Sequence, residues 1–93
     1  MYIKKREPHF WSKEELNKFL RTGTNLKITR TLQSGQKSTR KYQISWSGYF
    51  NNCFLFWIGE DGKQDPLKNL NTDKVLEFAR DPKREVILEL DAE

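Results

Sequence analysis

Residues 41–47, Lys-Tyr-Gln-Ile-Ser-Trp-Ser, alternate polar and apolar side chains, which is the period of a strand with one buried face. Residues 25–33 show the same alternation, interrupted on the apolar side by Arg30. Residues 34–38, Ser-Gly-Gln-Lys-Ser, lie between the two segments and have the composition of a turn. The sequence therefore predicts a β-hairpin of strands 25–33 and 40–47. Its tip is basic and carries Lys37, Arg40 and Lys41.

A helix before this hairpin is indicated by its capping signals. Ser12 and Glu15 have the spacing of a capping box, in which each side chain accepts a hydrogen bond from a backbone N–H at the start of a helix. The apolar residues that follow recur at helical spacing. We therefore expect an N-terminal helix over residues 13–21.

The residues after the hairpin predict further strands and a second helix. Residues 53–58 are apolar on both sides of a strand, so we expect this strand in the middle of the sheet or under a helix on each face. A short strand is expected before Asp65, and a second helix after a cap at Asn71 or Thr72. Residues 84–90 alternate again, which indicates a closing strand at an edge of the sheet.

These elements define the expected fold class. A chain of 93 residues accommodates one domain. Residues 1–9 contain a short basic run and Pro8, and are expected to form a flexible basic arm. Residues 10–93 are expected to form a single α+β domain. Its small antiparallel sheet would have three to five strands, with an N-terminal helix and a helix before the last strand.

Composition excludes several classes of protein. No apolar run approaches the roughly 20 residues that a membrane-spanning helix needs. Cys53 is the only cysteine, which excludes a disulfide scaffold, and the N-terminal residues lack the apolar stretch of a secretory signal. We therefore expect a cytoplasmic protein with no membrane partner.

The charge is distributed unevenly along the chain. The formal net charge is +4, but residues 16–59 contain no Asp or Glu and seven Lys or Arg residues. A solvated face normally mixes both signs, so this stretch indicates a surface that faces a polyanion. Nucleic acid is the favoured polyanion, and an acidic protein surface is the alternative.

Residues that carry out catalysis or bind metals are scarce. His9 is the only histidine and belongs to the expected arm, while Cys53 opens the most apolar strand and is expected to be a core residue. No zinc-ligand spacing and no glycine-rich phosphate loop is present. We therefore expect no catalytic residues, no metal, no cofactor and no enzymatic activity.

The candidate binding surface combines the basic hairpin with polar side chains that donate hydrogen bonds. Hydroxyl, amide and ammonium groups on strands can contact phosphates or base edges, and a two- or three-stranded ribbon fits the major groove of DNA. DNA is therefore favoured over RNA as the ligand. The expected nucleic-acid-binding residues are Lys27, Arg30, Lys37, Arg40, Lys41, Gln43 and Tyr49.

Residues 42–49, Tyr-Gln-Ile-Ser-Trp-Ser-Gly-Tyr, resemble the Tyr-x-Val-x-Trp-x-Gly-Tyr string of chromodomains. Trp57 lies at about the distance of their second tryptophan, and residues 69–78 are similar to the start of their C-terminal helix. The resemblance covers less than half of the chain, which departs from the family by its first helix and its last strand. It implies a peptide-binding alternative in which Trp46 and Tyr49 help form a methyl-lysine cage.

Two other classes of function stay open at this stage. A protein-binding adaptor or inhibitor, of the size that phages and mobile elements encode, would use the basic surface or pair its last strand with a partner's strand. A small ribonuclease would use Arg, Lys and Tyr alone. Exposed strand edges also permit a homodimer.

Overall fold

The computed structural model describes residues 2–6, 11–81 and 85–91. Its elements confirm the α+β class, with a helix before the sheet's main hairpin and a helix before the last strand. In chain order they are β1 (Tyr2–Arg6), α1 (Lys13–Leu20), β2 (Asn25–Thr31), β3 (Lys37–Ser47), β4 (Asn52–Ile58), the 3-10 helix η1 (Pro66–Lys68), β5 (Leu70–Asn71), α2 (Thr72–Ala79) and β6 (Val86–Asp91).

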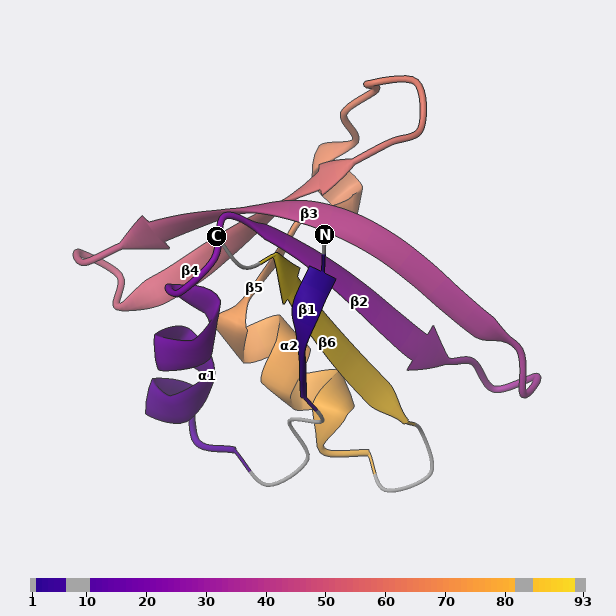
Figure 1. The fold of residues 1–93 in the computed structure, drawn as a ribbon, viewed down its shortest axis with the longest axis horizontal. Coiled ribbons are helices and arrows are strands. Elements are labelled where there is room, and N and C mark those ends of the chain that lie inside the picture. The colour runs from indigo at the N-terminus through magenta and orange to yellow at the C-terminus, as the bar shows by residue number, and fades with distance from the viewer. Residues whose placement is uncertain (1, 7–10, 82–84, 92–93) are drawn as a thin grey trace.

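All strands join one antiparallel sheet in the order β1-β6-β2-β3-β4-β5 (Figure 1). The sheet has six strands because Tyr2–Arg6, inside the segment expected as an arm, pairs with β6. Residues 1 and 7–9 of the expected arm lie outside the described residues. The strand at 86–91 is therefore internal rather than at an edge. Pairing on both sides satisfies the backbone N–H and C=O groups that an edge strand leaves open.

The hairpin of β2 and β3 has a shorter turn than the sequence suggested. Its register runs from Asn25 opposite Gln43 to Thr31 opposite Lys37. The Leu32 N–H donates to the Gln36 carbonyl at 2.7 Å. This bond follows directly after the Thr31–Lys37 pair and closes the turn. Gly35 has a φ of 88°, a conformation that favours glycine, and this local geometry lets β3 begin three residues earlier than expected.

The region before Asp65, expected to hold a short strand, contains none in the described chain. Gly62 instead adopts a φ of 70° in a turn, and the chain continues into η1. The side chain of Asp65 accepts a hydrogen bond from the Leu67 N–H and so caps this 3-10 helix. On its outer side β4 pairs with the two-residue strand β5, which lies opposite Phe54 and Leu55.

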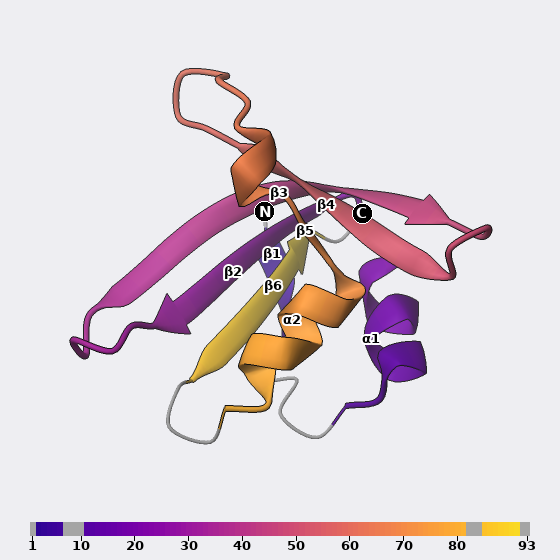
Figure 2. The same cartoon turned by 180° about the vertical axis from the view of Figure 1, so that it is seen from behind.

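Both helices pack on the same face of the sheet (Figures 1 and 2). The capping box of Ser12 and Glu15 is present, and α1 ends at Leu20 with Arg21 as its C-cap. The core between helices and sheet consists of Leu16, Leu20, Leu26, Ile28, Tyr42, Cys53, Leu55, Val75, Leu76, Ala79, Val86, Leu88 and Leu90. The sheet therefore has one covered face.

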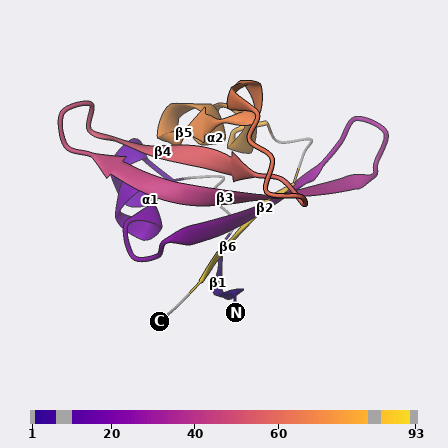
Figure 3. The ribbon, with the colours of Figure 1, turned by 90° about the horizontal axis from the view of Figure 1, so that it is seen from above.

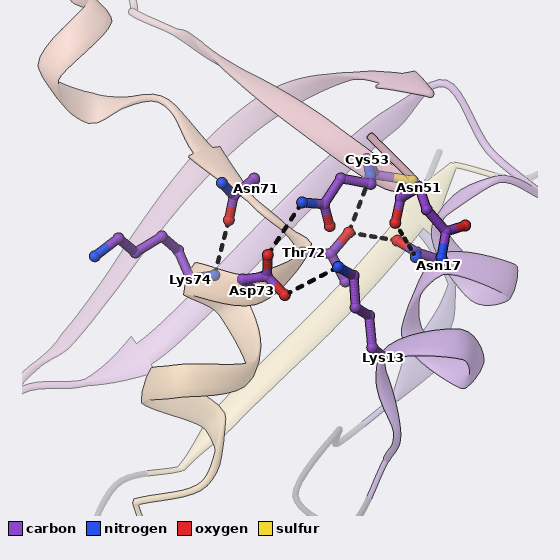
Figure 4. Close-up of polar contacts among 9 residues, drawn as sticks. Lys13, Asn17, Asn51, Cys53, Asn71, Thr72, Asp73 and Lys74 are labelled. Atoms are coloured by element: carbon purple, nitrogen blue, oxygen red, sulfur yellow. Dashed lines mark hydrogen bonds and ion pairs between the residues drawn. The ribbon is translucent and has the colours of Figure 1, made fainter. Parts of the chain in front are cut away.

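A small polar network joins the two helices to β4 (Figure 4). The buried Thr72 hydroxyl, at the start of α2, donates to the Asn17 side-chain oxygen of α1 and accepts from the Cys53 N–H at 3.0 Å. Asn17 also donates to the Asn51 carbonyl at 3.1 Å. These bonds satisfy buried polar groups and fix the position of both helices on the sheet.

Candidate functional site

The face of β2, β3 and β4 that points away from both helices has no covering layer among the described residues. Figure 3 shows these three strands side by side. Strand alternation and the pairing register assign the side chains on this face. We call it the open face, and it comprises Lys27, Thr29, Thr31, Lys37, Thr39, Lys41, Gln43, Ser45, Phe54, Phe56 and Ile58.

Three lysines of the acid-free stretch lie on the open face. Lys27 and Lys41 are direct partners in the β2–β3 ladder, and Lys37 lies further along the same face, opposite Thr31. Lys27 also forms an ion pair with Glu89 on β6, with 3.7 Å between Nζ and Oε1. Because β2, β3 and β4 contain no Asp or Glu, their part of the open face is cationic.

Hydroxyl and amide groups accompany these lysines. The hydroxyls of Thr29 and Thr39 lie 3.1 Å apart across the ladder, in a hydrogen bond exposed to solvent. Gln43 is exposed and lies opposite Phe56 on β4. These neutral groups can donate hydrogen bonds to phosphate or base oxygens beside the ammonium groups.

An aromatic row borders the cationic part of the open face. Phe54 and Phe56 occupy alternate positions of β4, and Phe56 is 46% exposed. The aliphatic Ile58 follows them on the same face. The row continues into the β3–β4 turn, where Phe50 packs edge-on against Phe54 with 5.8 Å between ring centroids. Tyr49 packs against Phe50 in the same way at 4.8 Å and is 91% exposed.

The expectation that β4 is buried on both faces is therefore wrong. Cys53 and Leu55 are fully buried under the helices, whereas Phe56 is exposed on the opposite side. The physical reason is that both helices pack on one face, so no layer remains for the other. Sequence reasoning missed Phe54 and Phe56 as site residues, although phenylalanines at alternate positions of a strand were the available signal.

Arg30 and Arg40 lie on the other face of the hairpin, apart from the lysines. Arg40 is the ladder partner of the buried Ile28, and the Arg30 guanidinium lies over the Phe78 ring of α2 at 4.1 Å from its centroid. Burial raises the pKa of Tyr42, and the positive charge of the nearby Arg40 partly opposes this effect. Of the seven expected binding residues, the open face thus brings together Lys27, Lys37, Lys41 and Gln43, and Tyr49 lies in the turn at its end.

The two aromatic residues of the chromodomain-like string have different surroundings. Trp46 packs against the core, and the Arg21 guanidinium lies over its ring at 4.2 Å from the centroid. Tyr49 contacts Phe50 instead. Because the chain's own arginine covers a face of the Trp46 ring, a methyl-lysine could not occupy that face without displacing it.

The sulfur of Cys53 is placed in the core. Its side chain is fully buried, and burial raises the pKa of the thiol, which keeps it protonated at neutral pH. Within the described ranges, no group of three or more His, Cys, Asp or Glu side chains is arranged to hold a metal ion. His9 lies outside the described residues.

The chain was compared with protein-family models, with curated proteins and with solved structures. No match was found in any of the three comparisons. In the described part of the chain, neither helix has the length and apolar character needed to cross a bilayer. The function is therefore inferred from the geometry of the open face.

Proposed function

We propose that this protein is a small nucleic-acid-binding protein that contacts phosphates through the open face. The observation that carries the proposal is the grouping of Lys27, Lys37 and Lys41 on one uncovered sheet face whose strands β2, β3 and β4 contain no carboxylate. Each lysine that meets a phosphate releases condensed counterions, so the binding weakens as salt rises.

The spacing of the lysines supports contact with a chain of phosphates rather than with one anion. Lys37 and Lys41 are four residues apart on β3, which corresponds to about 13 Å along a strand. Lys27 lies beside Lys41 on the next strand, roughly 5 Å away at the level of the backbone. A ligand that neutralises all three lysines must therefore be extended and carry several negative charges.

A titration monitored by fluorescence anisotropy tests the proposal. The labelled probes are DNA and RNA oligonucleotides of about 15 nucleotides, single-stranded or in duplex form, between about 50 and 200 mM salt. The test variant replaces Lys27, Lys37 and Lys41 with Gln. The matched control replaces Lys18, Lys74 and Arg80 with Gln, which removes the same charge from exposed positions on the two helices and at the end of α2.

We expect the open-face variant to lose about tenfold or more in affinity and to show a shallower salt dependence. The control is expected to stay within about threefold of the original protein, since general screening affects both variants equally. The proposal is overturned if no probe binds at low salt, or if both variants lose the same affinity.

A protein partner is the second candidate, and the edge of β3 favours it. The ladder to β4 begins at Lys41, so residues 37–40 pair with β2 on one side and have no strand on the other within the described chain. This edge and the loop 59–63 line a groove that includes Trp57 and Ile58. A partner strand could pair with this edge. In this ladder the Thr39 N–H points away from β2 and toward the open edge. Capture of a protein that survives nuclease treatment, and is lost on Thr39→Pro, would favour this candidate.

A further inference from the structure

We infer that the nucleic acid bound by the open face is single-stranded, and that its bases stack on the aromatic row of β4 and the β3–β4 turn. This inference rests on the proposed function and names the form of the ligand. Large aromatic side chains are exposed to solvent beside the lysines. The proposed phosphate contacts do not explain this exposure.

Several phenylalanine rings of this chain are exposed to solvent instead of being buried in the core. Burying a Phe side chain stabilises a folded protein, yet Phe56 is 46% and Phe50 61% exposed. They form one connected row, because Phe50 contacts Phe54, and Phe54 and Phe56 occupy alternate positions of β4. A contiguous exposed patch of this kind on a small domain marks a binding surface.

The residues opposite the rings leave room above them. Across the β3–β4 ladder, Ser45 lies opposite Phe54 and Gln43 lies opposite Phe56. Both side chains are shorter than a lysine, and Ser45 is too small to cover a ring. Phe56, which is 46% exposed, is therefore accessible to another planar group. Phe54 is partly buried and offers the part of its ring that Phe50 leaves uncovered.

The two rings are spaced as successive base platforms. Alternate residues of a strand lie about 7 Å apart, a separation that one step of an extended nucleotide chain can span. The lysines follow on β3 and β2, so a strand that lays its bases on β4 directs its phosphates across the sheet toward Lys41 and Lys27. Aromatic stacking combined with a cationic surface is the arrangement that binds single strands with little sequence preference.

A duplex cannot use this row in the same way. Its bases are already stacked on one another and present only their edges in the grooves, so a flat ring on a sheet has no base face to contact. A duplex would meet the lysines alone. The cations beside the row, with no carboxylate on β2 to β4, favour a polyanion over a neutral apolar partner or a second copy of the chain.

The test compares a single-stranded oligonucleotide of about 15 nucleotides with a duplex of the same length, on the full chain at about 50 mM salt. Both oligo-dT and oligo-U serve as single strands. The variant is Phe54→Thr with Phe56→Thr, because Thr favours strands. The matched control is Leu67→Thr, which removes an exposed apolar side chain on η1, outside the open face. Should the Thr variant fail to fold, Phe54→Leu with Phe56→Leu keeps the apolar surface and removes only the rings.

We expect the original protein to prefer a single strand over the duplex by about tenfold or more, and the double variant to lose most of that preference. The Leu67→Thr control is expected to bind single strands within about threefold of the original. Equal binding of single strands and duplex, unchanged in the double variant, overturns this inference and leaves the proposed function standing. Binding of neither probe overturns both.

Light scattering on the same proteins tests whether a second copy of the chain, rather than nucleic acid, occupies the aromatic row. If the original chain is a dimer that becomes a monomer in the double variant, while its nucleic-acid affinity is unchanged, the aromatic row is an interface between copies. That result overturns the inference.

Discussion

Lys27 and Lys41 are direct partners across the β2–β3 ladder, so two ammonium-bearing side chains share one rung of the open face. Like charges in this position destabilise a sheet by a few tenths to 1 kcal/mol. The ion pair of Lys27 with Glu89 on β6 partly offsets this repulsion. Lys41 lies opposite the uncharged Ile58 on its other side, so its charge has no such compensation in that ladder. A phosphate bound beside both ammonium groups would reduce the repulsion between them.

The two lysines are therefore expected to differ when they are replaced. Lys41→Gln should stabilise the protein by about 0.2–1 kcal/mol at low salt, because it removes the repulsion and breaks no described ion pair. Lys27→Gln should give a smaller gain or a loss, because it also breaks the pair with Glu89. Urea unfolding of both variants measures the difference. The difference should shrink in high salt, and a Lys41→Gln variant that is less stable than the original contradicts the prediction.

Asp91 predicts a loss of stability in acid. Its carboxylate accepts hydrogen bonds from the backbone N–H of Asn25, from the side chains of Thr24 and Asn25 and from the Thr24 N–H, which together lower its pKa to about 2. Because the pKa in the folded state lies below the unfolded value of about 3.9, this stabilisation is complete above pH 5 and is lost as pH falls toward 2.

Asp91→Asn should therefore be less stable at pH 7 by about 1–2 kcal/mol, allowing for partial exposure, and should lose less stability between pH 5 and pH 2. Thermal unfolding across this range is the measurement. Asp61→Asn in the exposed turn makes the same charge change and should leave the acid response close to that of the original chain. If the original protein, Asp91→Asn and Asp61→Asn lose the same stability in acid, the Asp91 carboxylate is not the cause of that loss.

The Thr72 hydroxyl is expected to be essential for the packing of both helices. Thr72→Val keeps the shape of the side chain but leaves the Cys53 N–H and the Asn17 side-chain oxygen without this partner in the core. The cost should be about 1–3 kcal/mol in chemical unfolding. Thr29→Val, which removes a solvent-exposed hydroxyl pair on the open face, serves as the control and should change stability by less than about 0.5 kcal/mol. Equal effects would indicate that the buried network contributes nothing specific.

Cys53 is expected to be unreactive in the folded protein. Its side chain is fully buried, and burial raises the pKa of the thiol above its usual value. A disulfide reagent at pH 8 should therefore label it only as fast as the protein opens, and labelling should accelerate by orders of magnitude in denaturant. Rapid labelling under native conditions would show that β4 is not held under the helices as described.

The main hairpin and the first helix could be predicted because their signals are local. Alternation at residues 41–47 and the capping box of Ser12 and Glu15 depend on neighbours in the sequence. The same alternation already placed Arg30 on the side of Leu26 and Ile28, so its separation from the lysines could have been read from the chain.

The exposed aromatic row and the position of β6 could not be predicted in this way. Phe54 and Phe56 are exposed because both helices pack on one face, which is a consequence of tertiary structure. The pairing of β6 with β1 and β2 joins segments from opposite ends of the chain. The acid-free stretch indicated a cationic surface, but the fold divides its cations between two faces.

The place of β6 between β1 and β2 has a consequence for synthesis and for truncation. Leu88 and Leu90 complete the core beside β2, yet they are synthesised well after the hairpin of β2 and β3. The hairpin can form earlier, but its apolar side is completed only by this strand, so we expect all-or-none folding once β6 has been synthesised. Deletion of residues 86–91 would remove an inner strand of the sheet, and β1 would lose the strand with which it pairs in the described structure.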